Sequence, residues 1–320
     1  MPFDDVARHT EPLLARRVLS ESAESADDDV FVAAQAHWDA FYRQRHDSFF
    51  QTRHYLHHSF PELLGQTPRG PPGNSVLINR DGKPLRNAEL TETSASSSSS
   101  SSSASSAYDY ADALRRCGIT QRGAVLLEAG CGTGSSLFSL GELLPEAQCA
   151  GCDLSAHAID LVRRHADYAQ GRFLGFVWDL SRQALDPAVS GFVQAGSVDV
   201  VTSIFMLSAV HPQLHVDSLL RLRALLKPGG LILFRDYGRY DMTQVRFHAR
   251  GNRVMAPNLY VRGDQTVAYF FSLDDVRAMA AAVNLSVLRV EYDVRKLINR
   301  KRKLTMYRVW IVAVLQRNDD

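Results

Sequence analysis

The sequence predicts an α/β protein built around a doubly wound, mostly parallel β-sheet. Three observations carry this prediction. From residue 108 onward, short apolar runs that suit buried strands alternate with longer segments that suit helices. A glycine-rich turn joins the first run to a helix, and single acidic residues end the next two runs. Because ligands bind where the strands of such sheets end, these features also predict the position of a site.

The expected elements follow from this alternation. Strands are expected at 124–129, 148–153, 172–178, 198–205, 231–235, 285–294 and 306–315. Helices are expected at 108–116, 135–144, 156–166, 214–226 and 273–283, the third capped by Ser155 and the fifth by Ser272. The string Lys227-Pro228-Gly229-Gly230 is expected to end a helix and turn into the fifth strand.

Three segments precede this domain, which is expected to span 108–320. Residues 1–30 are polar and are expected to be a mobile lead-in. Residues 31–65 interleave aromatic with basic residues, and we expect a helical leader that stacks bases and contacts phosphates, packs as a cap on the main domain, or does both. Residues 66–107 are rich in proline, glycine and serine, which predicts a flexible linker.

The composition bounds the function. The chain has 320 residues, of which 45% are hydrophobic and 22% charged, and a net charge of +1. Any nucleic-acid surface must therefore be local. No apolar run reaches the about 18 residues of a membrane span. Acidic residues near the N-terminus argue against a signal peptide and a mitochondrial presequence, so we expect a cytoplasmic location, with the nucleus as second choice.

The cysteines and histidines are not expected to bind a metal. Cys149 and Cys152 have the spacing of a redox or zinc half-site, but they lie in a predicted buried strand without a second pair. We expect reduced thiols buried in the core. The histidines of the leader lack cysteine or acidic partners at ligand spacing.

The glycine-rich turn indicates a class of ligand. Its residues Glu128, Gly130, Gly132 and Gly134 are spaced two apart, unlike the dinucleotide fingerprint G-x-G-x-x-G. The spacing resembles motif I of the class I S-adenosylmethionine-dependent methyltransferases, a Rossmann-like fold in which the loop contacts the amino-acid end of the cofactor. An acidic residue about 20 positions later is expected to hold the ribose hydroxyls, and Asp153 lies there. The alternative is a turn without a ligand.

Longer strings resemble a narrower family, the methyltransferase-like (METTL) tRNA N3-methylcytidine methyltransferases. They include HWDAFY at 37–42, DSFF at 47–50, RHYL at 53–56, SAVHP at 208–212 and FRDYG at 234–238. The match covers about residues 35–65 and 110–320. It implies a seven-stranded sheet with an antiparallel last strand. It also implies methylation of cytidine N3 in the tRNA anticodon loop, usually at position 32, with S-adenosylmethionine converted to S-adenosylhomocysteine.

The resemblance assigns cofactor contacts residue by residue. Trp38 and Tyr42 lie four apart on one helix face and can close over the cofactor. An acid at Asp179 can take the adenine amino group. The complete set implied by motif I and by the narrower family is Trp38, Tyr42, Glu128, Gly130, Gly132, Gly134, Asp153, Asp179, Leu180 and Ile204.

The chemistry suggests two catalytic candidates. Cytosine N3 has a free lone pair and needs no general base, whereas the methylated base is a cation. A carboxylate near the ring would stabilise that charge, and Asp236 is the candidate, with His211 second. The alternatives are an ion pair of Asp236 with Arg235 or another arginine, and a loop hydrogen bond for His211.

Local basic residues are expected to bind RNA, the densest cluster lying between the last two strands. They are Arg43, Arg45, Arg53, Arg235, Arg246, Arg262, Arg295, Lys296, Arg300, Lys301, Arg302 and Lys303. The expected partners are tRNA and an aminoacyl-tRNA synthetase or another tRNA-binding protein, without a membrane. Two other functions stay open: a methyltransferase of the same fold acting on a protein or small molecule, and a non-catalytic cofactor-binding partner of a tRNA-binding protein.

Overall fold

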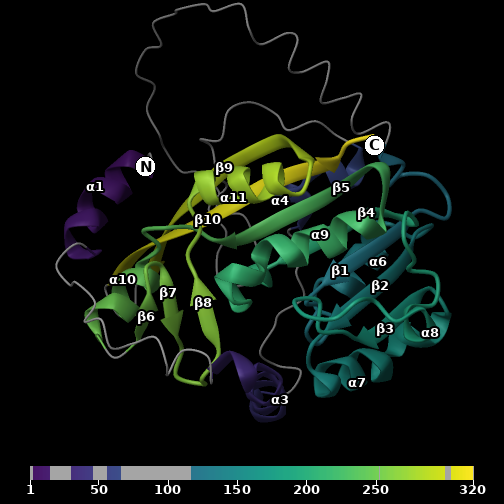
Figure 1. The fold of residues 1–320 in the computed structure, drawn as a ribbon, viewed down its shortest axis with the longest axis horizontal. Helices are drawn as coiled ribbons and strands as arrows, with labels where there is room; N and C mark the ends of the chain where they lie inside the picture. The colour runs from purple at the N-terminus through teal and green to yellow at the C-terminus, as the bar shows by residue number, and fades with distance from the viewer. Residues whose placement is uncertain are drawn as a thin grey trace, which may run out of the picture.

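The computed structural model describes residues 3–14, 30–45, 56–65, 117–251, 253–299 and 304–319. Its main sheet has seven strands: β1 (Val125–Ala129), β2 (Gln148–Asp153), β3 (Phe173–Val177), β4 (Val198–Ile204), β5 (Leu226–Tyr237), β9 (Leu285–Asn299) and β10 (Leu304–Arg317). Their order is β3-β2-β1-β4-β5-β10-β9. Strand β10 alone runs opposite to the other six strands of this sheet. The predicted doubly wound sheet with an antiparallel last strand is confirmed (Figure 1).

Helices cover both faces of this sheet. One face packs on α9 (His215–Leu225) and α11 (Leu273–Ala282), whose Leu222 and Val276 belong to one buried cluster. The other packs on α6 (Leu137–Leu143) and α7 (Ala156–Arg164), with Leu137 and Ile159 in a second cluster. Both predicted caps are confirmed. The Ser155 Oγ accepts from the Ala158 N–H at 3.1 Å, and Ser272 forms a capping box with Asp275. The remaining short elements are α8 (Pro187–Ser190), η2 (Ala166–Gln170), η3 (Leu207–Ala209) and η4 (Pro212–Leu214).

Two parts of this domain differ from the expectation. The string 227–230 lies within β5, which begins at Leu226 directly after α9. A second, three-stranded sheet of β6 (Val254–Ala256), β7 (Leu259–Val261) and β8 (Val267–Tyr269) stands beside α10 (Met242–Ala249). Strands of three residues are too short to show an alternating pattern, so the sequence did not indicate them. The helix expected at 108–116 lies outside the described residues.

The N-terminal residues form an ordered helix, α1 (Phe3–Leu14), so the mobile lead-in predicted for 1–30 is wrong over this stretch. The Phe3 ring stacks on Tyr292 with centroids 3.8 Å apart, and Val6 is buried. The Tyr240 hydroxyl donates to Glu11 at 3.4 Å. Apolar residues spaced three and four apart give the helix one face that packs against the β9–β10 ribbon.

The leader forms helices, as predicted, in its two described parts: α3 (Ala34–Arg45), then α4 (Leu56–Ser59) followed by η1 (Pro61–Leu64). The second part is buried against the sheet through Leu56, Phe60 and Leu63. The predicted linker at 66–107 and the leader residues 46–55 lie outside the described part of the chain.

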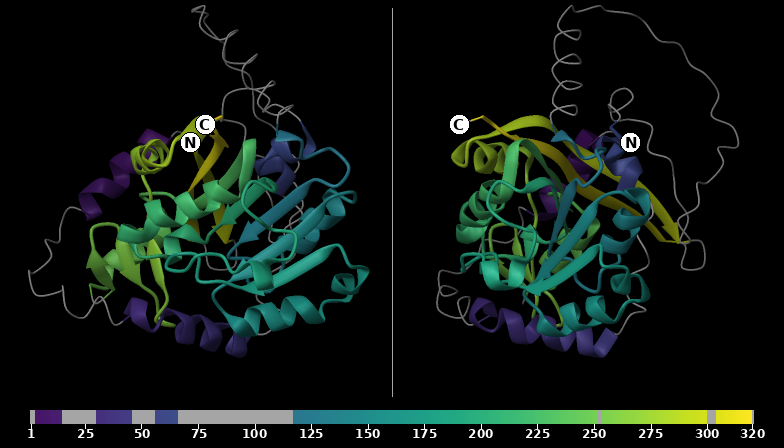
Figure 2. Two further views of the ribbon diagram at one scale, coloured as in Figure 1. Left: turned by 45° about the vertical axis from the view of Figure 1, so that its right-hand side comes forward. Right: turned by 90° about the vertical axis from the view of Figure 1, so that its right-hand side faces the viewer.

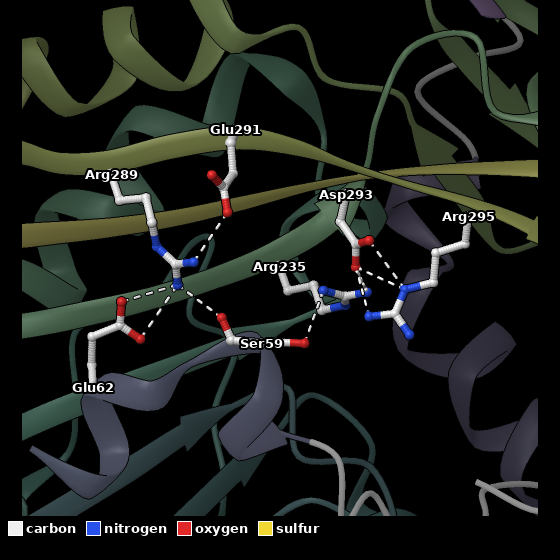
Figure 3. A network of polar contacts seen from close by, with 7 residues as sticks. All are labelled: Ser59, Glu62, Arg235, Arg289, Glu291, Asp293 and Arg295. Atoms are coloured by element: carbon white, nitrogen blue, oxygen red, sulfur yellow. Dashed lines mark hydrogen bonds and ion pairs between the residues drawn. The ribbon is translucent and has the colours of Figure 1, made fainter. Parts of the chain in front are cut away.

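A buried polar network fixes α4 and η1 to the sheet (Figure 3). The Arg289 guanidinium donates to the Ser59 carbonyl at 2.8 Å and pairs with Glu62 at 3.0 Å. Arg235 donates to the Ser59 hydroxyl at 3.1 Å and pairs with Asp293 at 2.7 Å. Because β5 and β9 supply these partners, the leader is tied to the same strands that approach the ligand edge of the sheet.

Candidate functional site

A cavity of about 250 Å³ lies at the carboxyl ends of the first four strands. Its floor comes from the turns after β1, β2 and β3 and from the loop after β4, and its cover comes from α3 and the residues just before it. Figures 1 and 2 show α3 beside α7, on the far side of the molecule from the C-terminus. Segments far apart in sequence therefore enclose one site, as the resemblance implied.

The glycine turn is closely packed by neighbouring side chains at the cavity. Gly130 has a φ of +67°, and a Cβ there would lie 2.3 Å from the Met206 Cγ. Gly132 has a φ of +55°, and a Cβ there would lie 2.8 Å from the Tyr42 hydroxyl. Larger residues would strain the backbone and collide with the cavity wall and with α3. The spacing seen in the sequence therefore has a steric cause.

Asp153 ends β2 at the cavity wall and is nearly buried. Its Oδ2 accepts from the Gly132 N–H at 2.8 Å, and its Oδ1 accepts from the Ser155 N–H at 2.9 Å. Burial raises the pKa of this carboxyl to about 6, although the two amide hydrogen bonds oppose the rise. Each carboxylate oxygen has room for a further donor, so the geometry suits a vicinal diol such as a ribose.

Asp39 joins α3 to this turn, a role that the sequence reasoning missed. Its Oδ1 accepts a short hydrogen bond from the Ser155 hydroxyl and another from the His157 N–H at 3.4 Å. Trp38 and Tyr42 flank it, with ring centroids 5.8 Å apart, and both line the cavity. The position of Asp39 between two predicted cofactor contacts was the available signal.

The other predicted cofactor residues divide into two groups. Asp179 and Leu180 line the cavity after β3, and the Asp179 Oδ1 accepts from the Ser181 hydroxyl at 2.6 Å. Four others lie behind the cavity wall, in β1, in the glycine turn or in the core of the sheet. These are Glu128, Gly132, Gly134 and Ile204.

Asp236 lies outside the cavity wall and is fully buried. Its Oδ2 accepts from the Ser208 N–H and its Oδ1 from the Tyr237 N–H, each at 2.9 Å. Burial raises the pKa of this carboxyl to about 6. In this geometry Asp236 does not reach a base in the cavity. It instead supports the loop after β4 through the Ser208 amide. Of the two alternatives, a pair with Arg235 is wrong, because adjacent strand residues face opposite ways and Arg235 binds Asp293. Another arginine does act on Asp236, since the positive charge of Arg262 opposes the rise of its pKa.

His211 does line the cavity. Its Nδ1 accepts from the Gln213 N–H at 3.2 Å, which is the loop hydrogen bond considered as the alternative to catalysis. The Phe31 ring meets the imidazole edge-on at 4.4 Å. Nearby, the buried His215 contacts the Val210 carbonyl through Nε2 at 3.0 Å, and burial lowers its pKa to about 4. A neutral His215 therefore helps to hold the loop that carries His211.

The predicted RNA contacts occupy different environments. Arg43, Arg246 and Lys296 are exposed, and Arg262 lies over the Tyr237 ring at 5.5 Å. Arg295 pairs with Asp293 at 3.0 Å. Arg235 is 1% exposed, so the prediction that it contacts RNA is wrong. The side chain of Arg45, together with Arg53 and residues 300–303, lies outside the described part of the chain.

The cysteines are free and buried, as predicted. Burial raises the pKa of the Cys149 and Cys152 thiols to about 12, so both stay protonated within β2. Across the described ranges, no cluster of three histidine, cysteine or acidic side chains is placed to hold a metal ion. No helix in the described residues has the length and apolar character needed to span a bilayer.

Known proteins resemble this chain in sequence and in fold. A methyltransferase-domain family model matches residues 104–290. The tRNA N(3)-cytidine methyltransferase METTL2 of Danio rerio is 35% identical over 280 residues, covering 87% of this chain and 72% of the relative. METTL2B of Homo sapiens is 34% identical over 306 residues, covering 88% and 79%.

A solved S-adenosylmethionine-dependent methyltransferase from Methanosarcina mazei superimposes with a TM-score of 0.50 at 16% identity. The superposition covers 62% of this chain and 95% of the other, and it supports the fold alone. The sequence similarity to METTL2 of Danio rerio extends over 87% of this chain. The chain belongs to the METTL2 family of tRNA N(3)-cytidine methyltransferases.

Proposed function

We propose that this protein transfers a methyl group from S-adenosylmethionine to N3 of a cytidine in the tRNA anticodon loop. One observation carries the proposal: the leader string at 37–42, by which the chain resembles the family, closes over the same cavity as the glycine turn. Trp38 and Tyr42 meet Gly130 and Asp153 there, although about 90 residues separate the two sets. A cofactor-binding turn alone would not indicate which molecule accepts the methyl group, whereas the leader string resembles that of the tRNA-modifying family.

The residues present fit S-adenosylmethionine. The turn at Gly130 is too closely packed for a Cβ and brings the bare backbone to the cavity wall, Asp153 can accept from both ribose hydroxyls, and Asp179 follows the neighbouring strand where an adenine amino group would lie. When bound, the cofactor supplies a methyl group on a positively charged sulfur. The cover formed by α3 excludes water from the reacting atoms, and aromatic rings tolerate a cation at their faces.

The protein's part in catalysis is mainly positional. Cytosine N3 attacks with its own lone pair, so no residue has to remove a proton before the step. The chain must place N3 in line with the bond that breaks, and this alignment supplies much of the rate. Asp236 acts as a positioning residue, because it holds the Ser208 amide of the loop that carries His211.

We further propose that a second tRNA-binding protein, such as an aminoacyl-tRNA synthetase, delivers the substrate. The net charge is only +1, and among the predicted RNA contacts that the structure describes, Arg235 is buried and Arg295 pairs with Asp293. These two cations therefore add little to the attraction of tRNA by charge. Adding a cognate synthetase to the purified protein is expected to raise kcat/KM for tRNA. A cytoplasmic location is part of the same proposal.

Incubation with radiolabelled S-adenosylmethionine and total tRNA tests the proposal. Nucleosides from the digested tRNA are expected to contain labelled 3-methylcytidine, and the Asp153→Ala variant is expected to give none. Label appearing in protein or small molecules but not in RNA would refute the tRNA assignment. Absence of any transfer, together with tight S-adenosylhomocysteine binding, would support a non-catalytic partner instead.

A further inference from the structure

Phe205 follows β4 in a backbone conformation that is rare for a bulky residue. Its φ is +57°, in the left-handed region that glycine favours. Such a conformation is strained, and strained positions persist where the surroundings hold them for a function. The Phe205 N–H donates to the Arg235 carbonyl at 2.7 Å, which anchors the conformation. The strain aims a large aromatic ring at the cavity, because Phe205 forms part of its wall.

Two further aromatic residues hold the Phe205 ring from behind. Its centroid lies 5.0 Å from Tyr237 and 6.2 Å from Trp310. Tyr237 and Trp310 are cross-strand partners in β5 and β10. The Arg308 guanidinium, which pairs with Asp241 at 2.8 Å, lies 5.1 Å from the centre of Trp310. The face of the Phe205 ring that points away from the cavity therefore packs against these residues, and the packing fixes the orientation of the face that lines the cavity.

The strand order places this ring on the acceptor side of the site. Asp179 and Asp153 follow β3 and β2, and the glycine turn follows β1. A bound cofactor is expected to place its adenosine over those two acids and its amino-acid end at the turn, and so to cross the ends of β3, β2 and β1 in that order. The next strand in this direction is β4, about 4.8 Å further on. Phe205 is the residue just after β4, and its neighbour Met206 touches Gly130. The ring therefore lies where donor and acceptor must meet.

A positively charged side chain lies beside the aromatic group of Phe205, Tyr237 and Trp310. Arg262 lies 5.5 Å from the centre of the Tyr237 ring, and its positive charge also acts on the buried Asp236 carboxyl, where it opposes the rise of the pKa that burial causes. Its position beside a base-sized aromatic surface suits the phosphate of a nucleotide turned out of its loop. The N3 atom takes part in base pairing, so the acceptor has to be presented unstacked, and an aromatic face replaces the stacking that is lost.

We propose that Phe205, backed by Tyr237 and Trp310, is the stacking surface for the cytosine that receives the methyl group, with Arg262 at the phosphate of that nucleotide. This proposal rests on the proposed function, because it assigns the acceptor half of that site. It gives the strained loop after β4 a role distinct from cofactor binding.

Fluorescence of a modified RNA tests the stacking. An anticodon stem-loop with pyrrolocytidine at the target position is titrated with the full-length protein, and stacking on Phe205 is expected to quench its emission. Phe205→Leu is expected to abolish the quenching and to lower kcat/KM for tRNA about 10- to 100-fold, while S-adenosylhomocysteine affinity stays within about twofold. Phe205→Tyr, which keeps a ring, is expected to restore both, and Phe192→Leu, outside the cavity, is the matched control.

The outcomes separate this proposal from the proposed function. Unchanged quenching and kcat/KM in Phe205→Leu, or no quenching with the unmodified protein, would overturn the stacking assignment. A parallel loss of S-adenosylhomocysteine affinity would also overturn it, because Phe205 would then belong to the cofactor. Failure of the unmodified protein to methylate any tRNA would instead remove the proposed function.

The phosphate contact has a separate test. Arg262→Met is expected to weaken stem-loop binding and to lower the slope of log affinity against log salt by about one. Arg122→Met is the control, because Arg122 precedes β1, at the amino ends of the strands and away from the cavity, and its side chain is 92% exposed. Equal salt slopes for the two variants would refute the contact.

Discussion

Lowering the pH is expected to weaken cofactor binding through one group, Asp153. Burial raises the pKa of this carboxyl to about 6 in the cofactor-free protein. Ribose hydroxyls donate hydrogen bonds to the ionised form, so binding should favour that form and lower the pKa. Protonation must then compete with binding in a range where an ordinary aspartate is fully charged.

The size of the effect follows from this pKa. An acid with a pKa of about 6 is mostly ionised at neutral pH and about one-tenth ionised one unit below its pKa. S-adenosylhomocysteine affinity should therefore fall about 10-fold between pH 7 and pH 5. Stability should change in the opposite sense. The rise from 3.8 to about 6 stabilises the cofactor-free fold at low pH by up to about 3 kcal/mol, and this contribution is lost as the pH rises through 6.

Isothermal titration calorimetry at several pH values measures the pH dependence of S-adenosylhomocysteine affinity. Repeating the titrations in two buffers of different ionisation enthalpy gives the number of protons released on binding. Asp153→Asn is expected to bind weakly with little pH dependence. Asp236→Asn is the matched control, because that carboxyl has a similarly raised pKa but lies outside the cavity wall. Affinity that stays flat between pH 5 and pH 7, or a pH dependence that survives in Asp153→Asn, would refute the reasoning.

Three further substitutions test the cover, the turn and the network. Gly130→Ala is expected to lower S-adenosylhomocysteine affinity at least about 10-fold by calorimetry, because the added Cβ meets Met206. The control is Gly196→Ala, where φ is +68° and the surrounding space is open, so that only the stability should change, by about 1 kcal/mol. Asp39→Asn is expected to lower the same affinity with a small change in melting temperature, and an unchanged affinity would contradict its role in holding α3. Arg235→Met is expected to lower the unfolding free energy in urea by about 3 kcal/mol and to leave the salt dependence of tRNA binding unchanged. A reduced salt slope would show that Arg235 contacts RNA after all.

Local chemistry explains why part of the site was predictable. The glycine spacing and Asp153 report a sharp turn and a strand end, both of which are properties of a short stretch. The strand positions followed from apolar runs, and the two caps followed from serines before helical segments. The prediction that the leader closes over the cavity came from the family resemblance, because the sequence of α3 alone does not indicate which surface the helix packs against.

The rest depended on three-dimensional facts that a sequence does not state. Arg235 and Asp236 are neighbours in the chain, yet one binds Asp293 and the other the loop after β4, because strand residues alternate faces. Their burial could not be told from residue type. The left-handed φ of Phe205 is equally invisible, because a phenylalanine in that position normally indicates an ordinary strand end.

Helix α3 is anchored on both sides along the chain. Before it, α1 packs on the β9–β10 ribbon, and after it, α4 and η1 are held by Arg235 and Arg289. A helix tethered at two points remains at high effective concentration over its docking surface, because it cannot diffuse away when its contacts break. Exchange of cofactor for product can then proceed by brief local opening, with reclosure as an intramolecular step whose rate does not depend on protein concentration.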